Sequence, residues 1–401
     1  MGLTMNFVLV EALTFGLGKL VKAAEDLNVT LHLLTHNKTI YFYELLNICS
    51  ENLVIVEIDT FKNENIIDYC QKLENFSGII NLTDTWTLSV QEISSLLGLK
   101  GQNPLSTSIC RNKSLLRKTL KENNLTSGFY TEIDPFSAKL PENIDFPVII
   151  KDPRGTGSKN VWLAENYIEA YNIISSVKES NILNKLLVET YFPGTLYSIE
   201  TISFRGETKV IAVSSRVLSD MPLFMEKAIS LPLSTNKNEL AGVEDWIEQV
   251  LSVISYTDGF AHTEFIVTPN GFEVVEVNPR LGGIQIGEAL CLAYNYNIYK
   301  AFIEMGMGIR PSLLDMSLTP LTYIGQVVIY ASKPGIFCKI DDNYINKNRT
   351  FVYPCALPGK EIVCLTDQSA CVGILLTTAQ NSEIALLNAF SEANKVSVLM
   401  E

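Results

Sequence analysis

The chain has little of what marks several large classes of protein. Its 401 residues include only three histidines, and its eight cysteines form no Cys-x-x-Cys pair, which argues against a zinc site. The cysteines lie within apolar runs, where reduced cysteines are usual. No apolar run reaches about 20 residues, the length that a membrane span requires. A basic segment ahead of an apolar one is missing from the first residues, so we expect no signal peptide and a cytoplasmic protein.

Charge is also scarce. Charged residues make up 19% of the chain and hydrophobic residues 47%, a composition that favours two or three packed domains over extended disorder. The net charge of −13 argues against a groove that follows a nucleic-acid backbone. A local basic pocket for one nucleotide is still compatible with that overall sign.

The first hundred residues alternate between strand and helix patterns. Apolar runs at 6–13, 30–35, 53–59 and 78–83 predict strands, and amphipathic stretches at 18–27, 64–73 and 86–97 predict helices. This rhythm predicts a doubly wound parallel sheet, in which Thr83-Asp84 ends a strand where such sheets place ligands. The Gly16-Leu17-Gly18 turn permits a dinucleotide site or merely a tight turn; without a third glycine we favour the turn.

The most informative segment is a predicted hairpin with acidic residues. Strands at 265–268 and 272–277 flank Asn270-Gly271, a strong hairpin signal. Pairing brings Glu264 near Glu276 and Asn278, and the last two share one face of their strand. Two carboxylates and an amide oxygen suit Mg²⁺. The alternative is a solvated polar strand, but the apolar flanks of the hairpin argue against it.

A second informative segment is a strand at 146–151 that ends in Lys151, followed by a loop of small residues and another strand at 161–164. Glycines allow backbone N–H groups to surround phosphate oxygens, and the Ser158 hydroxyl and the Lys151 ammonium add donors. The order of residues differs from a Walker A loop. The alternative is a flexible hairpin loop. The loop residues of interest are Gly155, Thr156, Gly157 and Ser158.

Two further segments add weaker signals. A predicted helix over 106–122 is rich in lysine and arginine, which we interpret as a solvated face with Lys113 as the exception. A predicted strand over 186–189 runs into a turn at Tyr191-Phe192. Its edge can offer main-chain groups and the Glu189 carboxylate to an adenine amino group.

In order and spacing, these segments resemble the ATP-grasp superfamily over about residues 100–300. More narrowly, the chain resembles the carboxylate–amine ligases that join L-amino acids into dipeptides, because residues 276–283 (Glu-Val-Asn-Pro-Arg-Leu-Gly-Gly) match their metal and substrate segment. The resemblance implies an α/β protein with the ATP-grasp fold. We expect an N-terminal doubly wound parallel-sheet domain (1–104), a small lobe with the phosphate loop (105–194), and a large lobe with the metal site and a C-terminal α+β subdomain (195–401).

The resemblance also implies roles for particular residues. ATP would lie between two sheets, with Lys113 on its phosphates, Lys151 on adenine and phosphate, and the loop closing over the phosphates. Glu189 and the backbone near Tyr191 and Phe192 would contact adenine. Two Mg²⁺ ions, which Mn²⁺ can replace, would be held by Glu264, Glu276 and Asn278. Arg280 would steady the transferred phosphate, with the Gly282 and Gly283 amides near the substrate.

Two positions depart from the family pattern. Leu196 stands where members often carry a ribose-binding glutamate. A Glu-x-Gly-His element of the dipeptide ligases is Glu226-Lys227-Ala228-Ile229 here, which keeps the acid and loses the histidine. Glu226 is therefore a candidate for binding a substrate ammonium, with a solvated glutamate as the equal alternative. The C-terminal hundred residues, with strands at 321–330, 351–353 and 372–377 and a helix at 382–394, bring no chemistry of their own.

We therefore expect an ADP-forming, ATP-dependent ligase that forms an amide bond through an acyl-phosphate from amino-acid-like substrates. Lys151 and Arg280 would be its catalytic residues. Its partners would be small-molecule acids and amines, with no nucleic acid or membrane, and it would form a homodimer. The alternatives are a carboxylase-like or purine-biosynthesis-like ATP-grasp enzyme that activates bicarbonate or formate, and a non-catalytic nucleotide-binding module.

Overall fold

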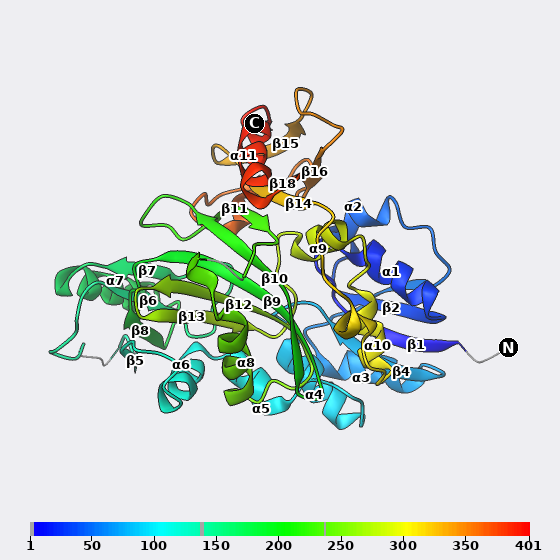
Figure 1. Ribbon diagram of the computed structural model, residues 1–401, viewed down its shortest axis with the longest axis horizontal. Coiled ribbons are helices and arrows are strands. Elements are labelled where there is room, and N and C mark those ends of the chain that lie inside the picture. Colours follow the sequence, from blue (N-terminus) through cyan, green and yellow to red (C-terminus); the bar gives the residue numbers. More distant parts are fainter. Residues whose placement is uncertain (1–3, 137–139, 236–237) are drawn as a thin grey trace.

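The N-terminal part of the chain forms a parallel sheet, as predicted. The computed structural model describes residues 4–136, 140–235 and 238–401. The first sheet has the order β3-β2-β1-β4 and lies at one side of the molecule, in blue and cyan in Figure 1. Its pairs are all parallel. The strands are β1 (Met5–Val10), β2 (Val29–Thr35), β3 (Leu53–Glu57) and β4 (Phe76–Asn81).

Helices cover both faces of this sheet. Phe7 and Leu9 of β1 pack into one core cluster with α1 (Leu17–Asp26) and α10 (Lys300–Gly306). Val8 and Val10 face the opposite way, into a cluster with α3 (Asn63–Lys72) and α4 (Thr87–Leu96). Successive side chains of a strand point to opposite faces, so a strand buried on both faces reads as a continuous apolar run.

The Gly16-Leu17-Gly18 segment serves a tight turn. Gly16 has φ +98°, and a Cβ there would meet the Tyr299 hydroxyl at 2.2 Å, so only glycine fits. The Gly18 amide donates to Glu44 Oε2 at 2.8 Å. The short α2 (Phe42–Leu45) supplies that carboxylate, so the amide is already bonded within the protein.

The small lobe is a four-stranded antiparallel sheet in the order β5-β8-β6-β7. The strand–loop–strand prediction for 146–164 is confirmed by β6 and β7. β8 lies inside the sheet, and the Tyr191 amide just beyond it donates to Pro147 O at 3.2 Å. The elements are β5 (Tyr130–Ile133), β6 (Val148–Lys151), β7 (Val161–Ala164), α7 (Tyr167–Ser180) and β8 (Leu186–Thr190).

The prediction of one helix over 106–122 was wrong. The chain forms α5 (Pro104–Cys110) and α6 (Lys113–Glu122), separated at Arg111-Asn112. The Asn112 side chain accepts hydrogen bonds from the Ser114 and Leu115 amides, at 3.1 and 3.2 Å. This N-cap starts a new helix and turns the chain toward the small lobe.

The large lobe is an eight-stranded sheet in the order β13-β12-β9-β10-β11-β14-β18-β16, which runs through the middle of Figure 1. The predicted hairpin is confirmed, because β12 and β13 pair antiparallel around Asn270-Gly271. The strands are β9 (Thr195–Phe204), β10 (Glu207–Leu218), β11 (Glu226–Leu231), β12 (Gly259–Thr268), β13 (Gly271–Asn278), β14 (Tyr323–Tyr330), β16 (Thr350–Pro354) and β18 (Cys371–Ala379). Helices α8 (Val243–Val253) and α9 (Ile286–Tyr294) complete this part.

The C-terminal strands β14, β16 and β18 confirm the predicted strands and continue the large sheet. Helix α11 (Ser382–Ala393) confirms the predicted helix and packs on β14 and β18. A small sheet that the sequence did not predict joins β17 (Glu361–Ile362), β15 (Gly335–Asp341) and β19 (Ser397–Met400). Short 3-10 helices lie at Lys38–Tyr41, Asn238–Leu240, Ser312–Asp315 and Gln368–Ala370.

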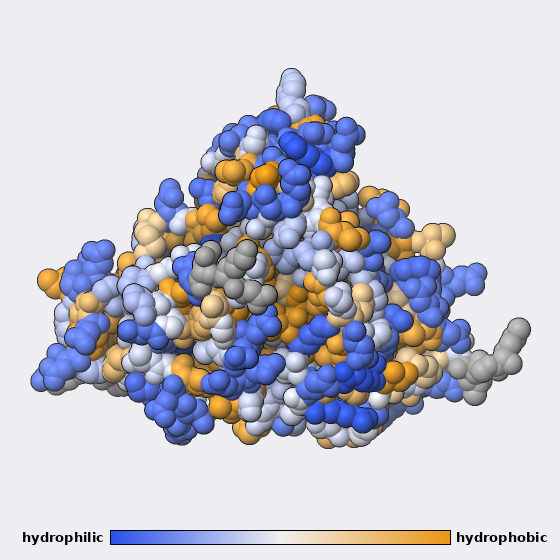
Figure 2. Space-filling model, viewed as in Figure 1, coloured by the Kyte–Doolittle hydropathy of each residue, from blue (hydrophilic) through white to orange (hydrophobic). Residues whose placement is uncertain are grey.

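The surface agrees with a packed interior. On the face shown in Figure 2, hydrophilic residues surround scattered hydrophobic ones, as on proteins whose larger apolar side chains lie inside. None of the helices in the described part of the chain combines the length and apolarity that a membrane crossing needs. All eight cysteines are free, as the sequence predicted.

Candidate active site

One face of the large sheet carries a polar floor. Strand register places Glu276 opposite Glu264, and Glu264 opposite Ser198. The next row along the strands joins Asn278, His262 and Glu200. Residues between them, such as Ile199 and Val277, point to the other face and pack in a hydrophobic cluster. Alternation along the strands thus separates a buried apolar face from an acidic one.

This floor and the small lobe enclose a cavity of about 290 Å³. The cavity brings together nearly every residue that the sequence assigned to a site. Gly282 is the exception, because it does not line the cavity and its amide donates to Glu200 Oε2 at 3.0 Å. Leu196 also lines the cavity. The predicted lining residues are Lys113, Lys151, Gly155, Thr156, Gly157, Ser158, Glu189, Tyr191, Phe192, Glu226, Glu264, Glu276, Asn278, Arg280 and Gly283.

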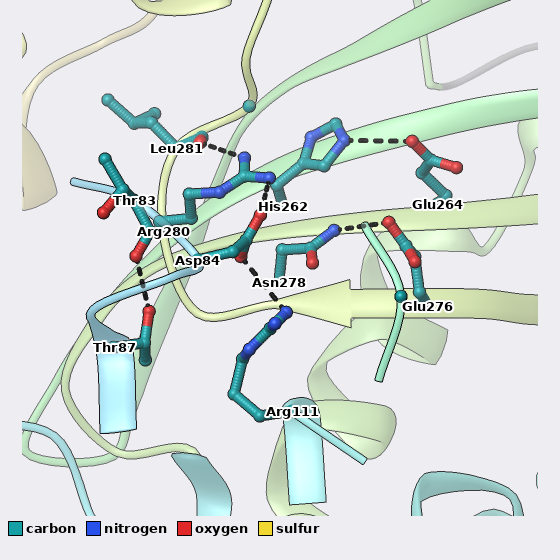
Figure 3. Close-up of polar contacts among 12 residues, drawn as sticks. Thr83, Asp84, Thr87, Arg111, His262, Glu264, Glu276, Asn278, Arg280 and Leu281 are labelled. Atoms are coloured by element: carbon teal, nitrogen blue, oxygen red, sulfur yellow. Dashed lines mark hydrogen bonds and ion pairs between the residues drawn. The ribbon is translucent and has the colours of Figure 1, made fainter. Parts of the chain in front are cut away.

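The three predicted metal ligands lie together at the end of the hairpin (Figure 3). Asn278 Nδ2 donates to Glu276 Oε1 at 2.8 Å, so the amide oxygen of Asn278 is turned away from that carboxylate. Each carboxylate has a protein cation beside it: Lys113 Nζ is 3.0 Å from Glu276 Oε2, and an Arg216 nitrogen is 2.9 Å from Glu264 Oε1.

Both carboxylates are held as anions. Burial by itself would raise the pKa of Glu276 and of Glu264, but their cations outweigh it, Lys113 for the former and Arg216 for the latter, and lower both values. Oxygen donors of this kind fit a divalent cation such as Mg²⁺. Among the described residues, no three His, Cys, Asp or Glu side chains gather as a metal cluster. A pair of carboxylates with an amide is therefore the donor set that the cavity offers.

The half of the cavity that the sequence assigned to the nucleotide, which we name the nucleotide half, contains Lys113, Arg117, Lys151, Glu189 and Glu276. Its buried charges cluster around Glu189. Arg117 Nε lies 2.7 Å from one oxygen of Glu189, and Lys151 Nζ lies 2.5 Å from the other. Burial raises the pKa of Glu189, but the two cations more than offset it and hold that pKa at about 2. Burial also lowers the pKa of Lys151, which Glu189 only partly restores. The predicted contact of Glu189 with adenine stays a prediction.

Arg117 corrects our interpretation of the basic helix as a solvated face. Its side chain is only 6% exposed, and it donates to the main-chain oxygens of Val274 and Val275 as well as to Glu189. Arg117 lies one turn after Lys113, between the buried Leu116 and Leu120. That i, i+3, i+4 stripe is a signal by which the sequence could have identified it.

The loop between β6 and β7 lies against Lys113. Lys113 Nζ donates to the Gly155 carbonyl at 2.7 Å, and its backbone amide donates to Pro153 O at 2.9 Å. Gly157 and Ser158 both have positive φ values, +63° and +57°. Such turns direct successive backbone N–H groups to one side, which suits a phosphate. Through these contacts and its ion pair with Glu276, Lys113 links the loop to the hairpin.

Arg280 is held from the N-terminal domain. Its guanidinium donates to Leu281 O at 2.7 Å and pairs with Asp84, which also lies 3.5 Å from Arg111 (Figure 3). Asp84 follows β4, at the sheet end where the sequence suggested a ligand site. Asp84 and Arg111 position Arg280; neither lines the cavity.

The other half of the cavity, which we name the acid half, is lined by Glu226, Arg216, His262 and Glu264, and we include in it Glu200, which is fully buried and pairs with His262. Glu226 is 2% exposed, so the alternative of a solvated glutamate was wrong. A bulge between β10 and β11, where Leu218 pairs with Glu226 and Lys227 has no partner, brings Glu226 beside Arg216. Burial raises the pKa of Glu226 to about 7, although Arg216 opposes the rise.

Three residues of the acid half escaped the sequence analysis. His262 pairs with Glu200; burial alone would lower its pKa, but Glu200 raises it to about 9. His262 stands two residues before Glu264, so strand alternation already placed it on the same face. Glu200 is a charge inside an apolar strand, which is a weaker signal. Arg216 had no local signal, because only the pairing of β10 with β9 and β11 brings it to the site.

Comparisons with known proteins concern the fold and the domain that contains this site. An ATP-grasp domain matches residues 110–284. An L-amino acid ligase from Bacillus licheniformis is 19% identical, covers 99% of both chains and superposes with a TM-score of 0.82. A phosphoribosylglycinamide synthetase from Anaerococcus prevotii is 15% identical, covers 99% of this chain and 100% of its own, and superposes with a TM-score of 0.75. The biotin carboxylase domain of Hydrogenobacter thermophilus 2-oxoglutarate carboxylase, solved with ADP, its magnesium salt and bicarbonate, is 14% identical, covers 100% of this chain and 92% of its own, and has a TM-score of 0.72.

Curated relatives are similar over part of their length. An uncharacterised protein of Sinorhizobium fredii, y4rH, is 22% identical over 72% of this chain, and the match spans 60% of that protein. Carnosine synthase 1 of Gallus gallus is 23% identical over 48% of this chain, and the match spans 22% of the synthase. The chain therefore has the ATP-grasp fold, as predicted, and residues 110–284 form an ATP-grasp domain.

Proposed function

We propose that this protein is an ATP-dependent carboxylate–amine ligase that joins amino-acid-like substrates and releases ADP and phosphate. The chain carries the fold of ADP-forming ATP-grasp ligases. The observation that supports the proposal most strongly is the pairing of Glu264 with Glu276, one row from Asn278, in the cavity that the loop residues and Arg280 also line. That arrangement serves the movement of a phosphoryl group.

The first chemical step follows from the charges that line the cavity. A carboxylate is a poor acylating agent, so an oxygen of the acid substrate attacks the γ-phosphorus of ATP and ADP leaves, which forms an acyl-phosphate. Lys113 and Lys151 would bind the ATP phosphates, and Arg280 would stabilise the charge on the transferred group. Mg²⁺ held by Glu264, Glu276 and Asn278 would neutralise phosphate charge. Positioning and charge neutralisation carry most of such a step.

In the second step the amine attacks the acyl carbon. The carbon–oxygen bond to phosphate breaks, the amide forms, and phosphate leaves with its bridging oxygen. Glu226, buried and with a pKa of about 7, is placed to hold a substrate ammonium or to accept a proton as the amine reacts. The loop at 155–161 would cover the phosphates and keep water from the intermediate.

Two of the similar proteins support amino acids as the class of substrate. An L-amino acid ligase and a carnosine synthase point to an amino-acid acid and amine. Ile229, which stands where the dipeptide ligases carry the histidine, is fully buried in a hydrophobic cluster and is not among the residues that line the cavity. The alternative, bicarbonate or formate as the activated acid, is supported by the similarity to a biotin carboxylase domain and to a phosphoribosylglycinamide synthetase.

The test is a screen of acid and amine pairs. The purified protein would be given ATP, Mg²⁺ and pairs of proteinogenic L-amino acids, with bicarbonate and formate in parallel. We expect ADP to appear only with a particular acid and amine together, and mass spectrometry to find their amide. ADP release with bicarbonate alone would contradict the ligase and favour the alternative. The homodimer and the cytoplasmic location stay predictions, which light scattering and cell fractionation would check.

A further inference from the structure

Arg216 is a buried cation of the acid half that the proposed mechanism leaves without a role. Its side chain is 7% exposed and lines the cavity. One terminal nitrogen bonds to Glu226 and lies 2.9 Å from Glu264 Oε1. The other terminal nitrogen lies 3.4 Å from both Ser198 Oγ and His262 Nε2. A single guanidinium thus joins the proposed metal carboxylate to the proposed ammonium site.

The bonding of this pair is incomplete. Among the described residues, Arg216 Nε and Glu226 Oε1 are buried and have no hydrogen-bond partner. A buried polar atom without a hydrogen bond costs free energy, so each of these two atoms is a candidate to bond to a ligand. One is a donor and the other an acceptor, and both residues line the same cavity. The pair therefore offers a site for a ligand that carries an anion and an N–H donor close together.

Lys113 and Arg216, the cations beside the two proposed metal carboxylates, differ in their second partner. Lys113 also bonds to the Gly155 carbonyl of the phosphate loop, so it belongs to the nucleotide half. Arg216 also bonds to Glu226, so it belongs to the acid half. A divalent cation on Glu264 would replace the attraction that now holds Arg216 there. The planar guanidinium would then have a free edge, which matches the two oxygens of a carboxylate.

We propose that Arg216 is a specificity-determining residue that binds the carboxylate of the acid substrate once a divalent cation has taken its place on Glu264. Glu226 beside it would accept a hydrogen bond from an N–H group of the same molecule. The acid substrate is then an acid with an amino group close to its carboxyl, such as an α- or β-amino acid. This inference rests on the proposed ligase function and adds the residue that binds and selects the acid substrate.

The first test measures cation binding without nucleotide. Mn²⁺ alone would be titrated into the parent, Arg216→Gln and Arg216→Lys, and free Mn²⁺ followed by electron paramagnetic resonance. We expect Arg216→Gln to bind Mn²⁺ about tenfold more tightly, because no cation competes for Glu264. Arg216→Lys, which keeps the charge, should bind it as the parent does. Equal or weaker Mn²⁺ binding by Arg216→Gln would overturn the exchange.

The second test separates the substrates, using the L-amino-acid pair that gives the fastest ADP release in the screen. Arg216→Gln should raise the KM of the acid about thirtyfold and leave the KM of ATP within about threefold. Arg216→Lys should raise the acid KM about tenfold, because an ammonium cannot replace the guanidinium fork. Arg117→Gln is the matched control, a buried arginine of the nucleotide half, and should raise the ATP KM instead.

The outcomes are distinguishable. Equal effects of Arg216→Gln on the KM of acid and ATP would overturn the assignment of Arg216. A parent protein that releases no ADP with any pair would instead contradict the ligase function, and the Mn²⁺ titration would still decide the exchange at Glu264. If Arg216→Gln does not fold, Arg216→Lys carries the KM test, and an unchanged acid KM in that variant would count against the proposal.

Discussion

Glu189 and Glu226 are both buried glutamates that line one cavity and pair with an arginine, yet their charges differ. Glu189, in the nucleotide half, has a cation on each oxygen and a pKa of about 2. Glu226, in the acid half, shares its arginine with Glu264, has no partner for one of its oxygens within the described part of the chain, and has a pKa of about 7. The number of cations per carboxylate, more than depth, decides whether a buried acid is ionised.

This difference divides the cavity into two kinds of surface. In the nucleotide half, the three cations Lys113, Arg117 and Lys151 pair with two carboxylates, Glu189 and Glu276, which leaves one positive charge in excess and suits an anionic ligand. The acid half has a carboxyl with a pKa of about 7 and, among the residues that the structure describes, a donor and an acceptor without partners. Such properties are typical of a site that its substrate completes. Variants that change one half and spare the other test this division.

The largest effect should come from the residue where the halves meet. Glu276→Ala should lower turnover by at least about 1,000-fold while the protein stays folded, because phosphate charge loses its neutralisation. Turnover measured by ADP release, with circular dichroism as the folding control, would check it. Activity within about threefold of the parent would remove Glu276 from the site.

The stability of the two glutamate variants should differ clearly. Glu189→Gln leaves Arg117 and Lys151 buried without their counter-charge and should reduce the free energy of unfolding by about 3 kcal/mol. Glu226→Gln replaces a carboxyl that is largely neutral at pH 6 and should change it by less than about 1 kcal/mol there. Urea denaturation of the parent and both variants would show this order. Equal losses would mean that the two sites have the same electrostatics.

The pH dependence of stability should differ in sign between the halves. Glu226 has a folded pKa raised above its ordinary value of 4.5, so its contribution to stability is complete below that value and is lost as pH rises through about 7. Glu189 has a lowered pKa, so its contribution is complete above 4.5 and is lost as pH falls toward about 2. Glu226→Gln should therefore gain stability relative to the parent between pH 5 and pH 8, measured by denaturation at several pH values with Arg310→Gln, a surface variant, as control. No change in the difference between the two proteins would contradict the raised pKa.

The smallest effect should come from outside the cavity. Asp84→Asn removes the charge that holds Arg280 and leaves the arginine itself in place. We expect kcat to fall about tenfold and the KM of ATP to stay within about threefold, because the fault lies in the position of a group that acts on the transferred phosphate. Steady-state kinetics would check this. A loss as large as that of Glu276→Ala would make Asp84 a direct participant.

The features that the sequence predicted correctly are those that a short local pattern determines. The Asn270-Gly271 hairpin, the Lys151 strand and the loop after it were predicted because turn chemistry and alternation act over a few residues. The break at Asn112 was missed although an N-cap marks it, because the basic run suggested one continuous helix. Arg117 was missed because we took a charged side chain to be an exposed one. Its contacts are with the main chain of Val274 and Val275, more than 150 residues away in the sequence.

The acid half was the least predictable part, for a physical reason. Arg216 comes from β10, Glu226 from β11 and Glu200 from β9, and no short motif joins them. Their contacts arise from sheet register and from one bulge at Lys227, which turns Glu226 toward Arg216. Most residues of the nucleotide half lie in short segments with a recognisable pattern, whereas Arg216 and Glu200 do not.

The central claim is an acyl-phosphate, and the fate of oxygen tests it directly. The productive acid would be labelled with ¹⁸O in its carboxylate and converted with ATP and the amine, and the products would be analysed by mass spectrometry. We predict one labelled oxygen in the released phosphate, one in the amide, and ADP as the nucleotide product. Label in AMP, with pyrophosphate released, would contradict the account.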